Sequence, residues 1–320
     1  MNTMQAAVFR GEGRVQVDDA PLPQPAAQEV RVRLRGCGVC ASNLPVWAGR
    51  PWFEYPLPPG NPGHEGWGEI AAIGETVQDF EIGEPVALLS AHAYAEYDVA
   101  DANAIARLPE PFADTPLPGE PLACAMNIFR RSAIEPGQWV AIVGVGFIGA
   151  LLVQLASSAG ARVIALSRRP FALQIARECG AKHAFSTEDK NAAVGTVQEL
   201  TQGAGCARVI EAAGEQSTLD IASALCAEGG RLVIAGYHQD GPRTVDMQQW
   251  NWRGLDVINA HERDPAMQAR GLRESMDALR DGRLDPSLLL THRLPLRELG
   301  TAFDLMQSRP DGFLKAVVMT

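Results

Sequence analysis

The chain has 320 residues, of which 28 are lysine or arginine and 38 are aspartate or glutamate, giving a net charge of −10. At roughly 150 residues per domain, this length predicts about two domains. A hydrophobic content of 46% excludes an intrinsically disordered chain. The acidic balance argues against nucleic acid or an anionic membrane surface as the principal partner.

The beginning of the sequence shows no basic stretch that leads into a long apolar segment, so no signal peptide is predicted. The longest apolar run, residues 139–153, is shorter than the roughly 18 residues that a transmembrane helix needs. Six cysteines in a chain of this length do not indicate a disulfide scaffold. We therefore expect a soluble cytoplasmic protein whose cysteines are thiols or metal ligands.

Residues 1–125 are rich in proline and glycine and contain short alternating runs. Residues 30–35 alternate apolar and basic side chains strictly, which predicts a strand with one solvated face. Residues 66–73 and 84–89 lie between turn residues and also predict strands. Together these runs predict an antiparallel β domain.

Residues 126–258 change character, because apolar strand-like runs now alternate with helical patterns. This alternation predicts a parallel sheet covered by helices on both faces. The predicted strands are 139–143, 162–166, 184–185, 208–211, 231–234 and 256–258, and the predicted helices are 147–159, 171–178 and 217–226.

Residues 259–320 return to a mixed pattern. Helical spacing predicts helices at 265–280 and 296–306, and the apolar run 314–319 predicts a closing strand. Composition alone does not assign this tail to either of the preceding domains.

Gly144, Gly146 and Gly149 form a G-x-G-x-x-G motif that includes Phe147 and Ile148. The motif follows a predicted buried strand and opens a predicted helix, which is the context of a dinucleotide-binding fingerprint. The first glycine permits a tight turn, the second lets the backbone approach a pyrophosphate, and the third allows close helix–sheet packing. The positive helix N-terminus attracts the phosphates, so we expect these five residues to bind a dinucleotide.

The end of the second strand in this region indicates which dinucleotide is bound. An NAD site usually ends that strand with an acid that binds the ribose hydroxyls. Here Ser167, Arg168 and Arg169 occupy that end, and the segment contains no acid. Arginine binds a 2′-phosphate through charge-assisted hydrogen bonds, which favours NADP(H) over NAD(H). The alternative is that one or both arginines are solvated surface charges.

Cys40, His64 and Cys124 are too widely spaced to form a compact zinc finger. Their neighbours are more specific: Cys40 ends Gly-Cys-Gly-Val-Cys, His64 is the centre of Gly-His-Glu, and Cys124 ends Glu-Pro-Leu-Ala-Cys. With the Ala-Tyr-Ala-Glu-Tyr run at 93–97, the glycine loop and the closing segment 303–315, these motifs cover essentially the whole chain. In this combination the chain resembles the zinc-dependent medium-chain dehydrogenase/reductase family, the alcohol dehydrogenase superfamily.

The resemblance implies an α/β fold in which a GroES-like β domain is combined with an inserted Rossmann domain, a doubly wound parallel sheet. Residues 1–125 and 259–320 would form the GroES-like catalytic domain, and residues 126–258 the dinucleotide-binding domain. It further implies a catalytic zinc in the cleft between the two domains and an assembly into a homodimer or homotetramer.

Residue by residue, Cys40, His64 and Cys124 match the family's zinc ligands, and Glu65 matches the acid that approaches or replaces the metal-bound water. Ser42 matches the hydroxyl that relays the proton. Two thiolates and one imidazole leave a fourth position open, as a catalytic zinc requires. The other cysteines are expected to be buried, unreactive thiols: Cys37, Cys179, Cys206 and Cys226.

Three features depart from the family's pattern. Only residues 90–92 fill the place of the four-cysteine structural zinc lobe, so we expect one zinc and no structural zinc. Asn43 stands where an Asp usually supports the zinc-ligating histidine, and a neutral amide would polarise the imidazole less. Pro45 stands where many members carry a proton-relaying histidine, so the proton would leave by water or by the cofactor ribose hydroxyls.

Aromatic and histidine side chains indicate a substrate pocket. Trp47 and Trp52 follow the Cys40 turn, and His92 and His261 are candidate polar contacts. The alternative is that these side chains belong to the core or to a subunit interface.

The main interpretation is an NADP(H)-preferring, zinc-dependent dehydrogenase or reductase that acts on a secondary or primary alcohol and its carbonyl partner. One alternative keeps the fold but is a zinc-free NADPH-dependent enoyl or quinone reductase. The ligand trio argues against it, because that branch lacks the cysteines. The other alternative is a non-catalytic NADPH-binding protein, which the Asn43 and Pro45 departures favour slightly.

Overall fold

The computed structural model describes residues 3–320 and divides the chain into two compact units. The first unit consists of Met1–Ala123, Pro265–Arg280 and Leu290–Thr320, so it is discontinuous in sequence. The second unit consists of Cys124–Asp264 and Asp281–Leu289.

The first unit is built on a mostly antiparallel sheet with strand order β14-β15-β3-β4-β5-β7, in which β6 also pairs with β3, and on the separate hairpin β1-β2. The predicted strand at 30–35 lies within β3, and Val30, Val32 and Leu34 point into the core as the alternation predicts. The strands are β1 (Thr3–Gly11), β2 (Arg14–Pro21), β3 (Glu29–Gly38), β4 (Gly66–Ile73), β5 (Pro85–Leu88), β6 (Tyr97–Asp101), β7 (Ile105–Arg107), β14 (His292–Pro295) and β15 (Ala316–Met319).

The C-terminal strand completes the sheet of the N-terminal residues, because Val318 of β15 pairs antiparallel with Cys37 of β3. This strand is shorter than the predicted 314–319. The backbone N–H groups of Leu314 and Lys315 donate to the Thr291 hydroxyl, at 2.9 and 3.3 Å, rather than to a neighbouring strand. The helical elements are η1 (Ala41–Asn43), α1 (Leu44–Trp47), η2 (Ala102–Ala104), η3 (Glu110–Phe112), α8 (Pro265–Arg280), η5 (Leu296–Glu298) and α9 (Leu299–Ser308).

An aromatic cluster forms the centre of the first unit's core. The ring of Trp47 stacks on that of Phe303 with centroids 5.3 Å apart, and Phe9 meets Phe303 edge-on at 5.5 Å. Trp47 Nε1 donates to the carboxylate of Asp304 at 3.2 Å, which satisfies the polar atom of a buried indole. These contacts join the hairpin, α1 and α9 into one core.

The second unit is a six-stranded, wholly parallel sheet with strand order β10-β9-β8-β11-β12-β13. Its strands are β8 (Trp139–Val143), β9 (Arg162–Ser167), β10 (His183–Ser186), β11 (Cys206–Glu211), β12 (Cys226–Ile234) and β13 (Asp256–Asn259). The helical elements are α2 (Gly119–Ser132), which starts in the first unit, α3 (Phe147–Ser158), α4 (Pro170–Glu178), α5 (Lys190–Leu200), α6 (Gln216–Leu225), α7 (Met247–Trp252) and η4 (Ser287–Leu289).

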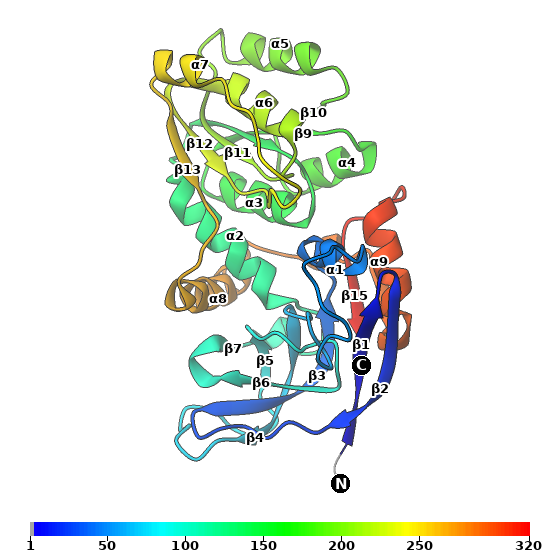
Figure 1. Ribbon diagram of the computed structural model, residues 1–320. Helices are drawn as coiled ribbons and strands as arrows, with labels where there is room; N and C mark the ends of the chain where they lie inside the picture. Colours follow the sequence, from blue (N-terminus) through cyan, green and yellow to red (C-terminus); the bar gives the residue numbers. More distant parts are fainter. Residues whose placement is uncertain (1–2) are drawn as a thin grey trace. The chain divides into compact units, whose positions relative to one another are not determined.

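Helices cover both faces of this sheet: α3 and α4 lie on one side, and α5 and α6 lie on the other (Figure 1). The predicted doubly wound arrangement is confirmed. Strand order reverses at β8, with β9 and β10 on one side and β11 to β13 on the other. Ligands of such sheets bind outside the carboxyl ends of the strands at this switch point. None of the helices in residues 3–320 is long and apolar enough to cross a membrane.

Truncating Phe303 tests the aromatic core. Phe303→Ala leaves a cavity among Phe9, Trp47 and Tyr94, so we expect the free energy of unfolding to fall by about 3–5 kcal/mol in urea titrations. Gln307→Ala on an exposed position of α9 is the matched control and should change it by less than about 0.5 kcal/mol. Equal effects of the two variants would contradict this description of the core.

Candidate functional site

A thiol, an imidazole and a carboxylate meet at one end of the first unit's sheet. The ligand atoms of Cys40, His64 and Glu65 all lie within 4.8 Å of one another. Cys40 follows β3, and His64 and Glu65 precede β4. These strands are antiparallel neighbours, with Cys37 opposite Gly66, so the exit of one strand meets the entrance of the other. Strand pairing therefore brings together residues more than twenty positions apart in the sequence.

The imidazole of His64 is oriented by the backbone. Its Nδ1 lies 2.9 Å from the carbonyl oxygen of Pro62, which places a proton on Nδ1 and leaves Nε2 to face the group. Burial by itself lowers the pKa of His64, but the neighbouring Cys40, Glu120 and Glu65 raise it to about 10. The negative surroundings that favour the imidazolium also favour a bound cation.

Glu65 is buried beside a lysine from the opposite end of the chain. The side chains of Glu65 and Lys315 are 1% and 5% exposed, and the Lys315 ammonium lies 2.6 Å from Oε1 and 2.5 Å from Oε2. Burial lowers the pKa of Lys315, but Glu65 and Cys40 raise it above its ordinary value, so the ammonium stays charged. A Cβ at Gly38 would lie 1.8 Å from Glu65 Oε2, so a larger residue there would displace the Glu65 carboxylate.

Ser42 lies beside the thiol of Cys40. Its hydroxyl donates to the Cys40 sulfur at 3.2 Å and lies 3.5 Å from Asn43 Oδ1. Asn43 is buried, and its amide donates to the Pro62 carbonyl at 3.1 Å and to the Tyr94 hydroxyl at 3.3 Å. Asn43 therefore shares an acceptor with His64 instead of contacting the imidazole directly.

The third predicted ligand, Cys124, is half-buried on α2 and belongs to the second unit. The structure thus groups two of the three predicted ligands with Glu65, and the role of Cys124 stays a prediction. The remaining cysteines are thiols within the core. Burial raises the pKa of Cys37 well above its ordinary value, of Cys179 to about 11, and of Cys206 and Cys226 to about 12.

The glycine loop lies between β8 and α3 in the second unit. Gly144 has φ +102°, a left-handed conformation that favours glycine, and a Cβ there would lie 2.9 Å from the Ala213 nitrogen. A Cβ at Gly149 would lie 2.1 Å from the Gly144 carbonyl oxygen. A Cβ at Gly146 meets nothing within 4 Å, so this backbone is open to a ligand. The three positions suit the turn, helix packing and close approach of a dinucleotide.

Phe147 and Ile148 begin α3, and Phe147 is buried. Ser167 is the last residue of β9, and its hydroxyl accepts from the Arg169 N–H at 3.3 Å. Arg169 also reaches the Val145 carbonyl of the glycine loop at 3.4 Å. Arg168 instead points to Glu215, as described below. The end of β9 and the glycine loop are therefore in contact through Arg169.

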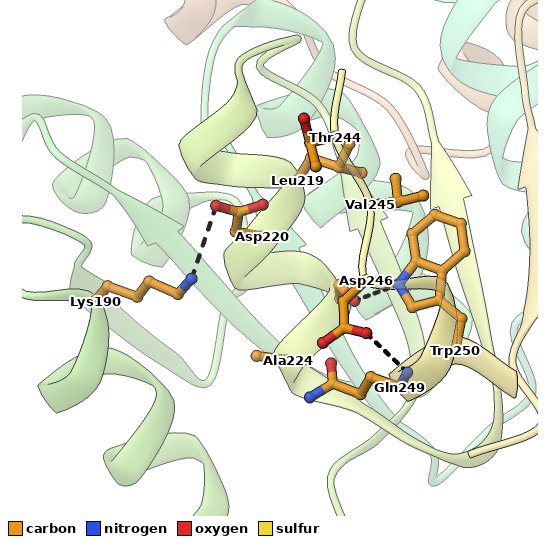
Figure 2. Close-up of a pocket in the computed structure, with 10 residues that line it drawn as sticks. Lys190, Leu219, Asp220, Ala224, Thr244, Val245, Asp246, Gln249 and Trp250 are labelled. Carbon is orange, nitrogen blue, oxygen red and sulfur yellow. Dashed lines mark hydrogen bonds and ion pairs between the residues drawn. The ribbon is translucent and has the colours of Figure 1, made fainter. Parts of the chain in front are cut away.

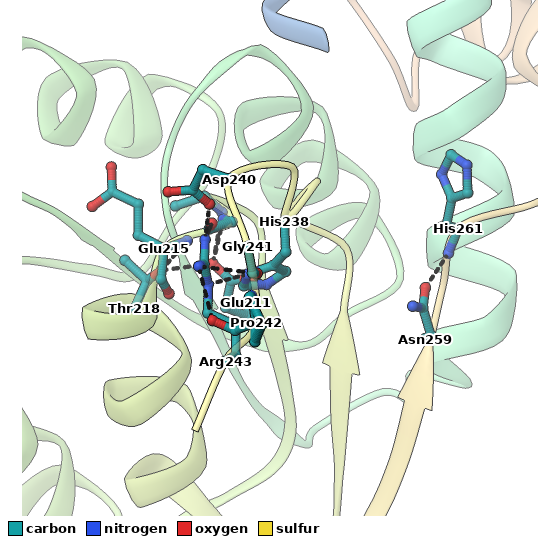
Figure 3. Close-up of polar contacts among 12 residues, drawn as sticks. Glu211, Glu215, Thr218, His238, Asp240, Gly241, Pro242, Arg243, Asn259 and His261 are labelled. Carbon is teal, nitrogen blue, oxygen red and sulfur yellow. Dashed lines mark hydrogen bonds and ion pairs between the residues drawn. The ribbon is translucent and has the colours of Figure 1, made fainter. Parts of the chain in front are cut away.

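A buried polar network that sequence reasoning missed lies at the carboxyl end of β11 (Figure 3). The fully buried Glu211 accepts from the backbone N–H groups of Ala213 and Gly214, at 2.9 and 2.8 Å. Its other oxygen lies 3.0 Å from His238 Nε2, and Arg243 Nε donates to His238 Nδ1 at 2.9 Å. This hydrogen-bond order requires His238 to be neutral with the proton on Nε2.

The network ties the loop after β12 to the loop after β11, because Arg243 also donates to the Gly214 carbonyl at 2.8 Å. The loop after β11 in turn lies against Gly144. The sequence did offer one signal, because Glu211 ends an apolar strand. A buried acid needs hydrogen-bond partners, so an acid at that position indicates a polar network. The partners themselves come from a separate loop and carry no local pattern.

The predicted pocket residues stay predictions, and each has its own surroundings within its unit. Trp47 packs in the aromatic core, and its remaining edge lines a groove of about 470 Å³ that also includes Arg14 and Gly300. Trp52 is 63% exposed, and His92 is exposed beside the segment that carries His64. His261 is an exposed residue of the second unit, with its ring 5.7 Å from that of Tyr237.

A cavity of about 230 Å³ lies between α6 and α7 of the second unit and is drawn in Figure 2. Asp220 and Asp246 supply its acids, and Trp250 forms one wall while its Nε1 donates to the Ser223 hydroxyl at 2.5 Å. None of the predicted cofactor, metal or pocket residues lines it.

Two protein-family models match the chain. The one described as alcohol dehydrogenase GroES-like domain matches residues 26–110, and the one described as zinc-binding dehydrogenase matches residues 148–274. The fold class predicted from the sequence, a GroES-like β domain combined with a doubly wound parallel sheet, is therefore confirmed.

Relatives match nearly the full chain. Sorbitol dehydrogenase of Halalkalibacterium halodurans is 25% identical over 331 residues, covering 93% of this chain and 94% of the relative. A Sinorhizobium meliloti protein described as a zinc-binding dehydrogenase and solved with NADP is 25% identical, with a TM-score of 0.84 over 100% of both chains. An alcohol dehydrogenase from Thermus sp. ATN1, 24% identical, has the same fold with a TM-score of 0.84 over 99% of both chains. The chain belongs to the medium-chain dehydrogenase/reductase family.

The Lys315–Glu65 pair supports a stability prediction. Lys315→Met leaves a buried carboxylate without its counter-charge, so we expect the free energy of unfolding to fall by about 3–5 kcal/mol in urea titrations. Adding Glu65→Gln should recover much of this loss, because the second change removes the unpaired charge. Arg293→Met, at an exposed position of β14, is the control and should have little effect. Additive losses in the double variant would contradict the ion pair.

Proposed function

We propose that this protein is a zinc-dependent alcohol dehydrogenase or carbonyl reductase that transfers a hydride between NADP(H) and an alcohol/carbonyl pair. The grouping of Cys40, His64 and Glu65 is the observation that carries the proposal. A thiolate and an imidazole are preferred zinc donors, and the surroundings favour a cation. We assign Cys40, His64 and Cys124 as ligands of one zinc, and we expect no structural zinc.

When bound, zinc polarises the substrate oxygen as a Lewis acid, and the nicotinamide accepts or donates the hydride. We assign Ser42 to receive the substrate's hydroxyl proton, because its hydroxyl lies beside Cys40. Glu65, whose carboxylate is paired with Lys315, places an acid beside the group. Pro45 has no proton to relay, so the proton continues through water or the cofactor ribose hydroxyls.

The dinucleotide is assigned to the glycine loop of the second unit. Gly144 has the left-handed conformation, Gly146 the open backbone and Gly149 the close packing that this role requires. Arg168 and Arg169 at the end of β9 favour NADP(H), and the relative solved with NADP supports that class of cofactor. The relative named sorbitol dehydrogenase supports a polyol as the first substrate class to assay. Cytoplasmic location and a homodimer or homotetramer stay predictions.

The zinc-free enoyl or quinone reductase and the non-catalytic NADPH-binding protein remain the alternatives. A zinc-free reductase would hold no stoichiometric metal and would reduce activated C=C bonds. A binding protein would take up NADPH without turnover. Metal analysis combined with NADPH-dependent turnover of alcohol, carbonyl and enone substrates separates all three.

The ligand assignment predicts a specific loss of metal. Cys40→Ser should lower both the zinc content and alcohol turnover to near background, while NADPH binding by fluorescence titration stays within about twofold, because the cofactor loop is on the other unit. Cys179→Ser, which changes a buried thiol outside the group, should keep wild-type zinc and turnover. Full activity of Cys40→Ser, or wild-type protein that contains no zinc, would overturn the proposed mechanism.

The glycine loop predicts a loss of binding without a loss of folding. Gly146→Ala places a methyl group where the pyrophosphate must approach, so we expect NADPH affinity to fall by about tenfold or more. The thermal unfolding temperature should change little, because the Cβ meets nothing within 4 Å. Gly195→Ala on α5 has the same open space and should keep wild-type affinity. Unchanged NADPH affinity in Gly146→Ala would refute this site.

A further inference from the structure

A carboxylate lies next to Arg168 although the end of β9 contains no acid. The Arg168 guanidinium nitrogen Nη2 is 3.1 Å from both carboxylate oxygens of Glu215. Arg168 follows β9, and Glu215 follows β11. These strands flank β8 on its two sides, so their carboxyl ends border the glycine loop from opposite directions. The acid that is absent from the second strand is therefore supplied by a different part of the sheet edge.

Glu215 is held in place by the helix that it begins. It is the N-cap residue of α6, and its side chain and backbone form a reciprocal capping box with Thr218. The Thr218 hydroxyl also donates to the buried Glu211 at 2.7 Å. Arg168 is the longer and more exposed partner, with its side chain 61% exposed against 41% for Glu215. Arg168 is thus the less constrained side chain of the pair, and Glu215 is the more constrained one.

The pair changes the electrostatics of the expected 2′-phosphate position. A 2′-phosphate needs the guanidinium of Arg168, which already faces a carboxylate, and it also meets the negative charge of that carboxylate. A ribose hydroxyl carries no charge and can donate a hydrogen bond to a carboxylate. Glu215 therefore weakens the binding of NADP(H) relative to that of NAD(H). Arg168 and Arg169 strengthen the binding of NADP(H).

We propose that Glu215 is a specificity-determining residue that lowers the selectivity for NADP(H) over NAD(H) by competing with the 2′-phosphate for Arg168. The inference rests on the proposed dinucleotide site, and it assigns a function to a residue on α6 rather than on β9. Discrimination between the two cofactors is then a difference of two opposing contributions.

Cofactor affinities of the full-length protein test this inference. Fluorescence titration with NADPH and with NADH gives dissociation constants for the wild type and for Glu215→Gln at one low ionic strength. Since an exposed ion pair contributes about 0–1 kcal/mol and a direct repulsion is also removed, we expect NADPH to bind about three- to tenfold more tightly in the variant. NADH affinity should stay equal or decrease. Glu135→Gln, an exposed acid that precedes β8 at the amino end of the sheet, should leave both constants unchanged.

Two further variants separate the outcomes. Glu215→Ser keeps a favourable N-cap and removes the acid, so it should show the same shift even where the glutamine variant folds poorly. In an Arg168→Gln background the gain in NADPH affinity should fall by at least half, because the competition for that guanidinium is gone. An unchanged ratio of the two dissociation constants in folded Glu215→Gln or Glu215→Ser overturns the inference and leaves the proposed function standing. A wild type that binds neither cofactor overturns both.

Discussion

The buried ion pair between Lys315 and Glu65 is the contact on which the candidate site of the first unit depends. Glu65 directly follows His64, and Lys315 directly precedes β15, which pairs with the strand that leads to Cys40. Because a buried carboxylate is costly without a partner, the lysine is what allows an acid to lie beside the thiol and the imidazole. The pair also joins residues 250 positions apart, so segments from both ends of the chain contribute to this part of the first unit.

In the second unit, the corresponding constraint is the reversal of strand order at β8. Parallel strands present their carboxyl ends at one edge, so every loop that follows a strand is available to the same ligand. The glycine loop, Arg168, Glu211 and Glu215 come from the carboxyl ends of three strands, β8, β9 and β11. Arg168 and Glu215 form an ion pair between two of these loops, so the charge at this edge depends on contacts between loops and not on one strand's sequence.

Local patterns predicted much of the fold. The alternation of residues 30–35 and the periodicity of 265–280 correspond to β3 and α8, and the glycine motif was recognisable because each glycine has its own steric reason. Four α-helices of residues 3–320 were not predicted: α1, α2, α5 and α7. In two of them the apolar stripe is weak, because α5 has only Ala193 and Val197 buried and none of the residues of α7 is buried. Trp47 lies in the aromatic core, and a tryptophan near a functional turn carries no sequence signal that distinguishes a pocket wall from a core.

The sequence by itself determined which chemical groups are present: the thiols, the imidazole and the arginines after β9. It also determined local backbone geometry, by placing glycines where a Cβ would clash or where φ is positive. The tertiary structure alone decided which groups meet. The meeting of Cys40 with His64 follows from the register of β3 and β4, and that of Arg168 with Glu215 follows from strand order. Register and strand order are set by long-range packing and hydrogen bonding. The spacing of these residues along the chain does not show which strands will be neighbours.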